Sequence, residues 1–231
     1  MRNLLVVALL FILTSEVKAQ EIKIDLGYKY LFANKWDKAI QTYNFSRPNL
    51  VEKQPLFMNG LTGSFTKIFK STKRLNHGIN FSYSYFRSWA QNESSINSLN
   101  LHFFNVGYTL HYESKEKLKG LYTDLIIAAT SSGLFRYVDG KPFVYDEKKS
   151  KAFGEGGEIN LKMGYYLKIK NDFYFSPFIQ LGYTPYFFSP QTETVINQTK
   201  SLSSKNWTAI LNAQIGVAFH IIKSEQELKI E

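Results

Sequence analysis

Eight long stretches of this chain alternate between apolar and polar residues, and this alternation constrains the fold more than any other feature. In the clearest stretch, 206–222, one parity holds Trp207, Ala209, Leu211, Ala213, Ile215, Val217, Phe219 and Ile221. Side chains of a β-strand point to opposite faces with a period of two residues, so each stretch is predicted to be a strand with one apolar face. The other stretches are 21–33, 56–70, 77–89, 99–113, 120–131, 158–170 and 173–187.

The predicted strands are long, and the connections between them alternate in length. With roughly 12–17 residues each, they exceed the 5–6 residues usual in soluble proteins and are long enough to cross a bilayer at a tilt. The connections 34–55, 90–98, 132–157 and 188–205 are long, whereas 71–76, 114–119 and 171–172 are short. Long outer loops and short periplasmic turns are typical of outer-membrane barrels. The sequence therefore predicts an all-β fold, a closed antiparallel eight-stranded transmembrane β-barrel whose apolar face meets lipid.

Several segments leave alternatives open. Asp139-Gly140 lies between two β-rich runs in 136–146 and predicts a hairpin, which we interpret as a surface ribbon above the fifth strand. A ten-stranded barrel is the alternative, and 39–45 is a candidate for a further piece of strand over the barrel mouth. A secreted β-sandwich would show the same alternation, but its second face is not expected to be so rich in Gly, Ser, Asn and Thr. Pro177 cannot donate a ladder hydrogen bond, so we expect a β-bulge there.

The first 19 residues have the layout of a secretory signal peptide. Arg2 precedes an unbroken apolar run over 4–13, and Val17-Lys18-Ala19 forms a small-residue junction. This run is too short to span a bilayer as a helix. We therefore expect cleavage near Ala19/Gln20, leaving 20–231 as the barrel with a short charged tail. The chain contains no Cys, so neither disulfides nor thiolate metal sites are available.

On this pattern, nearly the whole mature chain resembles the small eight-stranded outer-membrane barrels of the OmpA/OmpX type. The resemblance rests on the alternating strands and the loop asymmetry, with no specific motif. It implies an outer-membrane location in a Gram-negative envelope. The enzymes known on this scaffold acylate or deacylate lipid A, and this chain resembles them in fold only.

The parity of each strand assigns residues to the lipid interfaces and to the lumen. Aromatic residues expected at the interfaces are Trp89 and Trp207 at the outer one, and Phe69, Tyr112 and Phe173 at the periplasmic one. Charged residues expected to face inward are Lys23, Asp25, Lys29, Asp124, Glu158 and Lys162. Eight strands enclose only a side-chain-filled interior, so these charges form either a paired polar plug, which we favour, or a narrow pore.

No catalytic set is evident. His102, near the outer rim, is a weak candidate for a general base in a lipid-modifying enzyme. The other three histidines, His77, His111 and His220, are expected at periplasmic strand ends as ordinary rim residues. We therefore assign no catalytic residue, cofactor or metal.

The formal net charge of +9 suggests anionic partners. Export argues against nucleic acid, whereas basic loops suit the phosphate-bearing glycolipid of the outer leaflet. The sequence favours a monomer with a structural or surface-interaction role through loops 34–55 and 132–157. A lipid A acyl-transfer or deacylation enzyme and a narrow channel for small molecules remain as alternatives.

Overall fold

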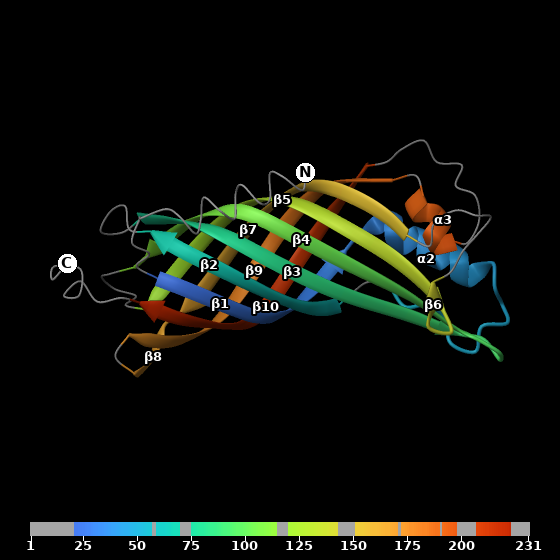
Figure 1. Ribbon diagram of the computed structural model, residues 1–231, viewed down its shortest axis with the longest axis horizontal. Helices are drawn as coiled ribbons and strands as arrows, with labels where there is room; N and C mark the ends of the chain where they lie inside the picture. Colours follow the sequence, from blue (N-terminus) through green and yellow to red (C-terminus); the bar gives the residue numbers. More distant parts are fainter. Residues whose placement is uncertain are drawn as a thin grey trace.

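The computed structural model is a barrel of antiparallel strands (Figure 1), described over 21–56, 59–69, 75–114, 120–142, 151–170, 172–189, 191–197 and 207–222. The barrel strands are β1 (Glu21–Phe32), β2 (Asn59–Phe69), β3 (Leu75–Gln91), β4 (Ile96–Glu113), β5 (Leu121–Val138), β7 (Lys151–Tyr165), β9 (Phe173–Phe188) and β10 (Trp207–Ile222). Pairing of β10 with β1 closes the sheet. Two further strands, β6 (Lys141–Pro142) and β8 (Leu167–Lys170), are too short to span a membrane. The predicted eight-stranded barrel is confirmed; the predicted signal peptide and charged tail lie outside the described residues.

The strands are strongly staggered around the barrel. A row of paired residues that leaves β1 at Ile22 passes through every spanning strand and returns to β1 at Phe32, ten residues further on. In an eight-stranded barrel a stagger of this size tilts the strands by about 40° from the axis and leaves an interior that side chains can fill.

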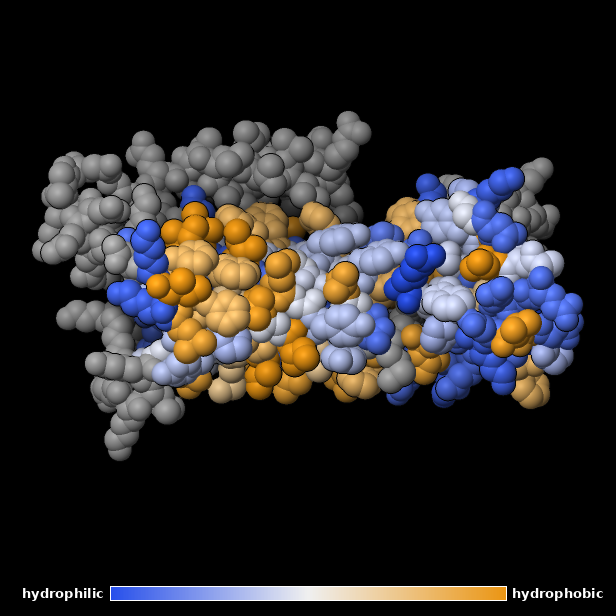
Figure 2. All heavy atoms as spheres, turned by 90° about the horizontal axis from the view of Figure 1, so that it is seen from below, coloured by the Kyte–Doolittle hydropathy of each residue, from blue (hydrophilic) through white to orange (hydrophobic). Residues whose placement is uncertain are grey.

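The two faces of the sheet differ sharply in polarity. Outward side chains of β1, β7 and β9 such as Leu26, Leu161 and Leu181 are 48–64% exposed, and Figure 2 shows apolar residues gathered over the part of the barrel away from the helices. Polar and charged residues gather over both ends of the molecule in the same view. An exposed apolar band around a closed barrel is the surface that lipid chains require, so the apolar face of the predicted strands is the outer one.

The strands project beyond the membrane at one end. Both β4 and β5 contain 18 residues. At about 3.3 Å per residue and a tilt of about 40°, such a strand rises about 45 Å, whereas the apolar band of an outer-membrane barrel is about 25 Å tall. The surplus lies at the end that carries the two helices (Figure 1), which we call the outer end. At this end β3 continues to Gln91 and β4 begins at Ile96, so only 92–95 connect the two strands. The long loop predicted over 90–98 is therefore wrong.

The two helices at the outer end are α2 (Asn34–Phe45) and α3 (Gln191–Asn197). The prediction of a strand over 39–45 is wrong, because Trp36, Ala39, Ile40 and Tyr43 are the buried residues of one helical face. Their spacing of i, i+3, i+4 and i+7 is the helical period. The predicted hairpin is confirmed: Val138 pairs with Lys141, and Asp139 and Gly140 both have positive φ, as a type I′ turn requires.

No described helix is long and apolar enough to cross a membrane.

Both prolines of β9 lie where its ladder with β7 is interrupted. The β7–β9 pairing ends at Gly164↔Phe178, one residue from Pro177, and it skips the position of Pro185 between Gly156↔Tyr186 and Ile159↔Tyr183. On the other side, β9 pairs with β10 without a shift in register, so the bulge predicted at Pro177 is wrong. The missing proline donors are accommodated by the gaps on the β7 side.

Candidate functional site

The lumen contains six charged side chains that pair with one another. Lys23 with Asp124, Lys162 with Asp25, and Lys29 with Glu158 form three ion pairs, the last with an Nζ–Oε1 distance of 2.6 Å. All six residues are buried. They are the residues that strand parity assigned to the interior, but their partners come from strands far apart in the sequence: β1 with β5, and β1 with β7.

Further polar side chains lie among these ion pairs in the lumen. Asn212 donates to Glu158 over 3.2 Å, and Ser64 donates to Asp25. Two lumen cavities, one beside Gln180 and one beside Thr184, each leave about 10 Å³ for the centre of a water molecule. That is about the space that one water needs. This geometry supports the plug and not a continuous aqueous pore.

Above this polar layer, the outer mouth is closed by an apolar core. Trp36 of α2 stacks on Phe103 and meets Tyr186 edge-on, with ring centroids 6.1 and 5.5 Å apart. The core continues through Leu31, Phe86, Leu99, Leu101, Leu134, Ile196 and Ile210, each no more than 4% exposed. The helices are therefore packed into the barrel mouth as in a soluble domain, and they seal it.

Arg136 joins both helices to β5. Its Nε and Nη2 donate to the carbonyls of Val195 and Ile196 over 2.7 and 2.6 Å, and its guanidinium lies 4.7 Å from the centroid of the Tyr43 ring. Carbonyls in the last turn of a helix lack intrahelical partners, and a cation there is favourable. An Arg side chain stays charged in proteins, so this buried group remains a cation. This role was not among the predictions, although an Arg on the inward parity of β5 was its signal.

His102 faces the lipid and not the lumen. It is on the outward parity of β4, and its Nδ1 lies 2.7 Å from the hydroxyl of Tyr83. Two open grooves of about 500 and 490 Å³ flank this pair, with Leu61 in one and Phe153 in the other. Among the residues that the structure describes, no serine hydroxyl bonds to His102, so a base–nucleophile pair of the kind expected for acyl transfer is not formed.

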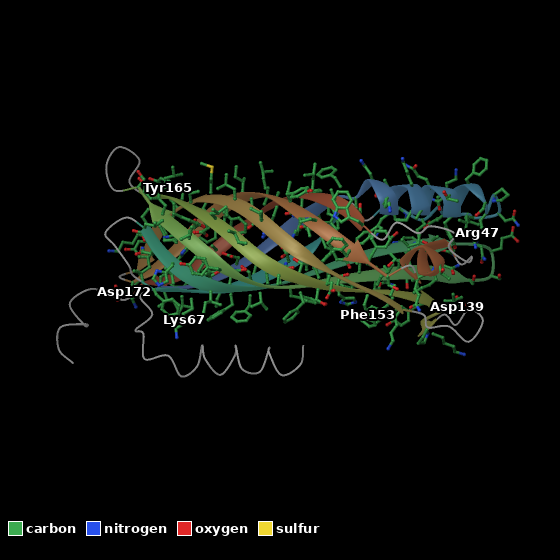
Figure 3. All side chains as sticks on the ribbon, turned by 90° about the horizontal axis from the view of Figure 1, so that it is seen from above. Arg47, Lys67, Asp139, Phe153, Tyr165 and Asp172 are labelled. Atoms are coloured by element: carbon green, nitrogen blue, oxygen red, sulfur yellow. The ribbon has the colours of Figure 1, made fainter. Side chains whose placement is uncertain are left out.

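The predicted interface aromatics divide into two groups. Trp89, Trp207, Tyr112 and Phe173 are 36–47% exposed on the outer surface of the barrel. Phe69 differs, because it is only 7% exposed and its ring lies 6.0 Å from that of His77. Lys67, on the same strand, points away from the barrel (Figure 3), with its ammonium 5.5 Å from the Phe69 ring.

The histidines expected at the periplasmic end do not form one group. His77 lies on the lipid side against Tyr108, whereas His111 and His220 are fully buried inside the barrel. Within the lumen, ligand atoms of Glu21, His111 and Glu113 lie within 4.8 Å of one another, so these residues are able to hold a metal ion. Sequence reasoning placed the histidines at this end but missed both glutamates.

No protein-family model and no curated protein sequence matches this chain. Among solved structures, it is similar to Ail, the attachment invasion locus protein of Yersinia pestis, at 7% identity and a TM-score of 0.47, covering 88% of this chain and 100% of that one. Neisserial surface protein A matches at 6% identity and a TM-score of 0.49, covering 88% and 96%. The outer membrane protein OprG from Pseudomonas aeruginosa matches at 12% identity and a TM-score of 0.39, covering 89% and 98%.

These similarities concern the fold alone. The resemblance to small eight-stranded outer-membrane barrels holds at that level, and the strand pairing of this chain is what establishes it.

Proposed function

We propose that this chain is an outer-membrane barrel with a structural or surface-interaction role at the cell surface. The part that carries this role is the outer end, formed by α2, α3 and the outer ends of the strands, which we call the platform. The observation that carries the proposal is the sealed outer end, where α2 and α3 share one apolar core with the barrel strands. A filled lumen with about 10 Å³ of space at each of two points does not favour transport. The strands extend well beyond the apolar band, and this extra length would place the platform outside the membrane.

The exposed surface of the platform indicates its partner class. Phe45 is 91% exposed and Val51 68% exposed, and the side chains of Lys38, in the same helix as Phe45, and Lys53 are exposed as well. Lys141 is exposed at the tip of the hairpin. Aromatic and basic side chains together suit a phosphate-bearing glycolipid or an anionic extracellular partner. We propose that the chain acts as a monomer after removal of 1–19.

The orientation is tested by single-cysteine labelling, because the chain contains no Cys. Phe45→Cys lies on the platform, and Asp172→Cys lies at the opposite end of the barrel, where Figure 3 labels Asp172. In intact cells, a membrane-impermeant maleimide should label the Phe45→Cys variant, and it should label the Asp172→Cys variant only after permeabilisation. The reverse pattern, or a labelled protein in the soluble fraction, contradicts the proposal.

The glycolipid partner is tested with the purified barrel in vesicles that contain lipid A with or without its phosphates. Phosphorylated lipid A should raise the temperature at which the barrel unfolds, which is read from the loss of the gel band of the folded form. Lys38→Gln with Lys53→Gln and Lys141→Gln should remove most of this increase. Lys168→Gln changes a Lys that is also exposed but lies at the opposite end, in β8, and is the matched control. Equal stabilisation of all variants would leave the platform without a lipid-binding role.

A lipid-modifying enzyme is the second candidate, and the grooves beside His102 favour it. Both grooves open on the lipid side of the barrel, where an acyl chain has access. His102 would have to act as the base, with its Nδ1 held by Tyr83.

A further inference from the structure

The periplasmic end of the lumen holds carboxylates that its lysines do not neutralise. Lys23, Lys29 and Lys162 pair with Asp124, Glu158 and Asp25. In the described part of this end, the partners of the remaining carboxylates are histidines. Glu21, which is 3% exposed, lies close to His111 and His220, and Glu113, whose side chain is 32% exposed, lies close to His111. A buried carboxylate needs a compensating cation.

From this cluster we infer that Glu21, His111 and Glu113 bind one divalent transition-metal cation of the Zn²⁺ class across the periplasmic mouth. His111 Nε2 lies 3.2 Å from Glu113 Oε1 and 3.8 Å from Glu21 Oε2. For ligands 2.1 Å from a metal, these separations correspond to angles of about 100° and about 130°, within the range of a slightly distorted tetrahedral site. An imidazole with carboxylate oxygens favours such a cation over Ca²⁺ or Mg²⁺, which prefer oxygen ligands alone.

Two of the three ligands are held by a second residue on the side away from the proposed metal. The Nδ1 of His111 lies 2.6 Å from Asp124 Oδ1, and Oε1 of Glu21 lies 2.6 Å from His220 Nδ1. When a metal binds Nε2, the one proton that His111 keeps is on Nδ1, directed at Asp124, and the lone pair of Nε2 is on the side of the two glutamates. This carboxylate–histidine–metal arrangement fixes the tautomer and orientation of a ligating imidazole.

Tyr166 offers an oxygen for a fourth coordination position, and Glu113 marks the side from which an ion can enter. The hydroxyl of Tyr166 lies 3.2 Å from His111 Nε2, and 3.2 and 3.3 Å from Oε1 and Oε2 of Glu21. Glu113, at the end of β4, is partly exposed and opens the cluster to the periplasm. The bound ion would link β1 to β4 across the lumen, so we expect it to stabilise the barrel at its periplasmic end.

The test uses the mature chain, purified from outer membranes in detergent and freed of metal with a chelator. Equilibrium dialysis against Zn²⁺, read by elemental analysis, should give one ion per chain. Glu113→Gln changes the most exposed ligand, so it preserves folding, and it should weaken binding by at least about tenfold. His77→Asn changes a histidine at the same end but outside the lumen, and it should bind Zn²⁺ as the unaltered protein does.

Further measurements distinguish a specific metal site from nonspecific binding of Zn²⁺. X-ray absorption should show a first shell of N and O atoms that includes one imidazole, and Zn²⁺ should raise the temperature at which the barrel loses its folded gel mobility. No bound Zn²⁺ at 100 µM, or equal affinity in Glu113→Gln, would overturn the assignment and leave a network of hydrogen bonds only. Tighter binding of Ca²⁺ than of Zn²⁺ would overturn the metal class. All these outcomes are independent of the role of the outer platform.

Discussion

Replacing Lys29 by Met is expected to reduce the free energy of unfolding by about 3–5 kcal/mol, because it leaves Glu158 as a buried charge without its cation. Lys29 is 4% exposed and Glu158 2% exposed, and their charged atoms are 2.6 Å apart. After the substitution, Glu158 would keep the hydrogen bond from Asn212 at 3.2 Å. One such bond contributes about 1.5–3 kcal/mol even to a charged group, less than the desolvation penalty of several kcal/mol for an uncompensated ion.

A second substitution isolates the charge from the packing. Lys29→Met combined with Glu158→Gln removes both charges and keeps an acceptor for Asn212, so most of the lost stability should return. Lys168→Met, on an exposed lysine of β8, is the control and should change stability by no more than about 0.5 kcal/mol. Urea unfolding in lipid vesicles, followed by gel mobility and tryptophan fluorescence, measures all three. A single variant as stable as the unaltered protein, or a double variant less stable than the single one, would refute the reasoning.

Three further predictions concern the outer end, the lumen and His102 on the lipid side. Arg136→Met should release α3 and increase proteolysis at the outer end, because two hydrogen bonds from a charged donor to carbonyls are lost at about 1.5–3 kcal/mol each. Arg87→Met, on an exposed side chain of β3, is the control. The unaltered barrel should give no conductance steps in a planar bilayer, and reproducible steps would contradict the plug. His102→Ala should leave the mass profile of lipid A unchanged on cells that express the protein, and a shifted profile would instead support the enzyme.

The alternation of apolar and polar residues predicts the barrel, but it does not predict the structure at the ends of the barrel. A period of two residues assigned Lys23 and Asp124 to the interior and Leu26 to the lipid, because each strand has only two faces. The same reasoning failed over 39–45, where Ile40 and Tyr43 also fit the helical spacing with Trp36. Short apolar segments fit either period, and here packing in the barrel mouth decides.

The partners of the charged side chains in the lumen could not be predicted from the sequence. Lys29 and Glu158 are separated by 129 positions, and the stagger of ten residues around the barrel sets which lumen side chains share one level. The ligand cluster at the periplasmic mouth shows the same dependence. Glu21 and Glu113 lie at the ends of different strands, and only closure of the sheet brings both to His111.

The amino-acid sequence by itself determined that the chain forms long strands with one face for lipid, since side-chain direction along a strand is a local property. Tertiary structure decided which charges meet, which mouth is closed and which histidines are buried. Those outcomes depend on register and stagger, which arise from pairings between residues distant in the chain.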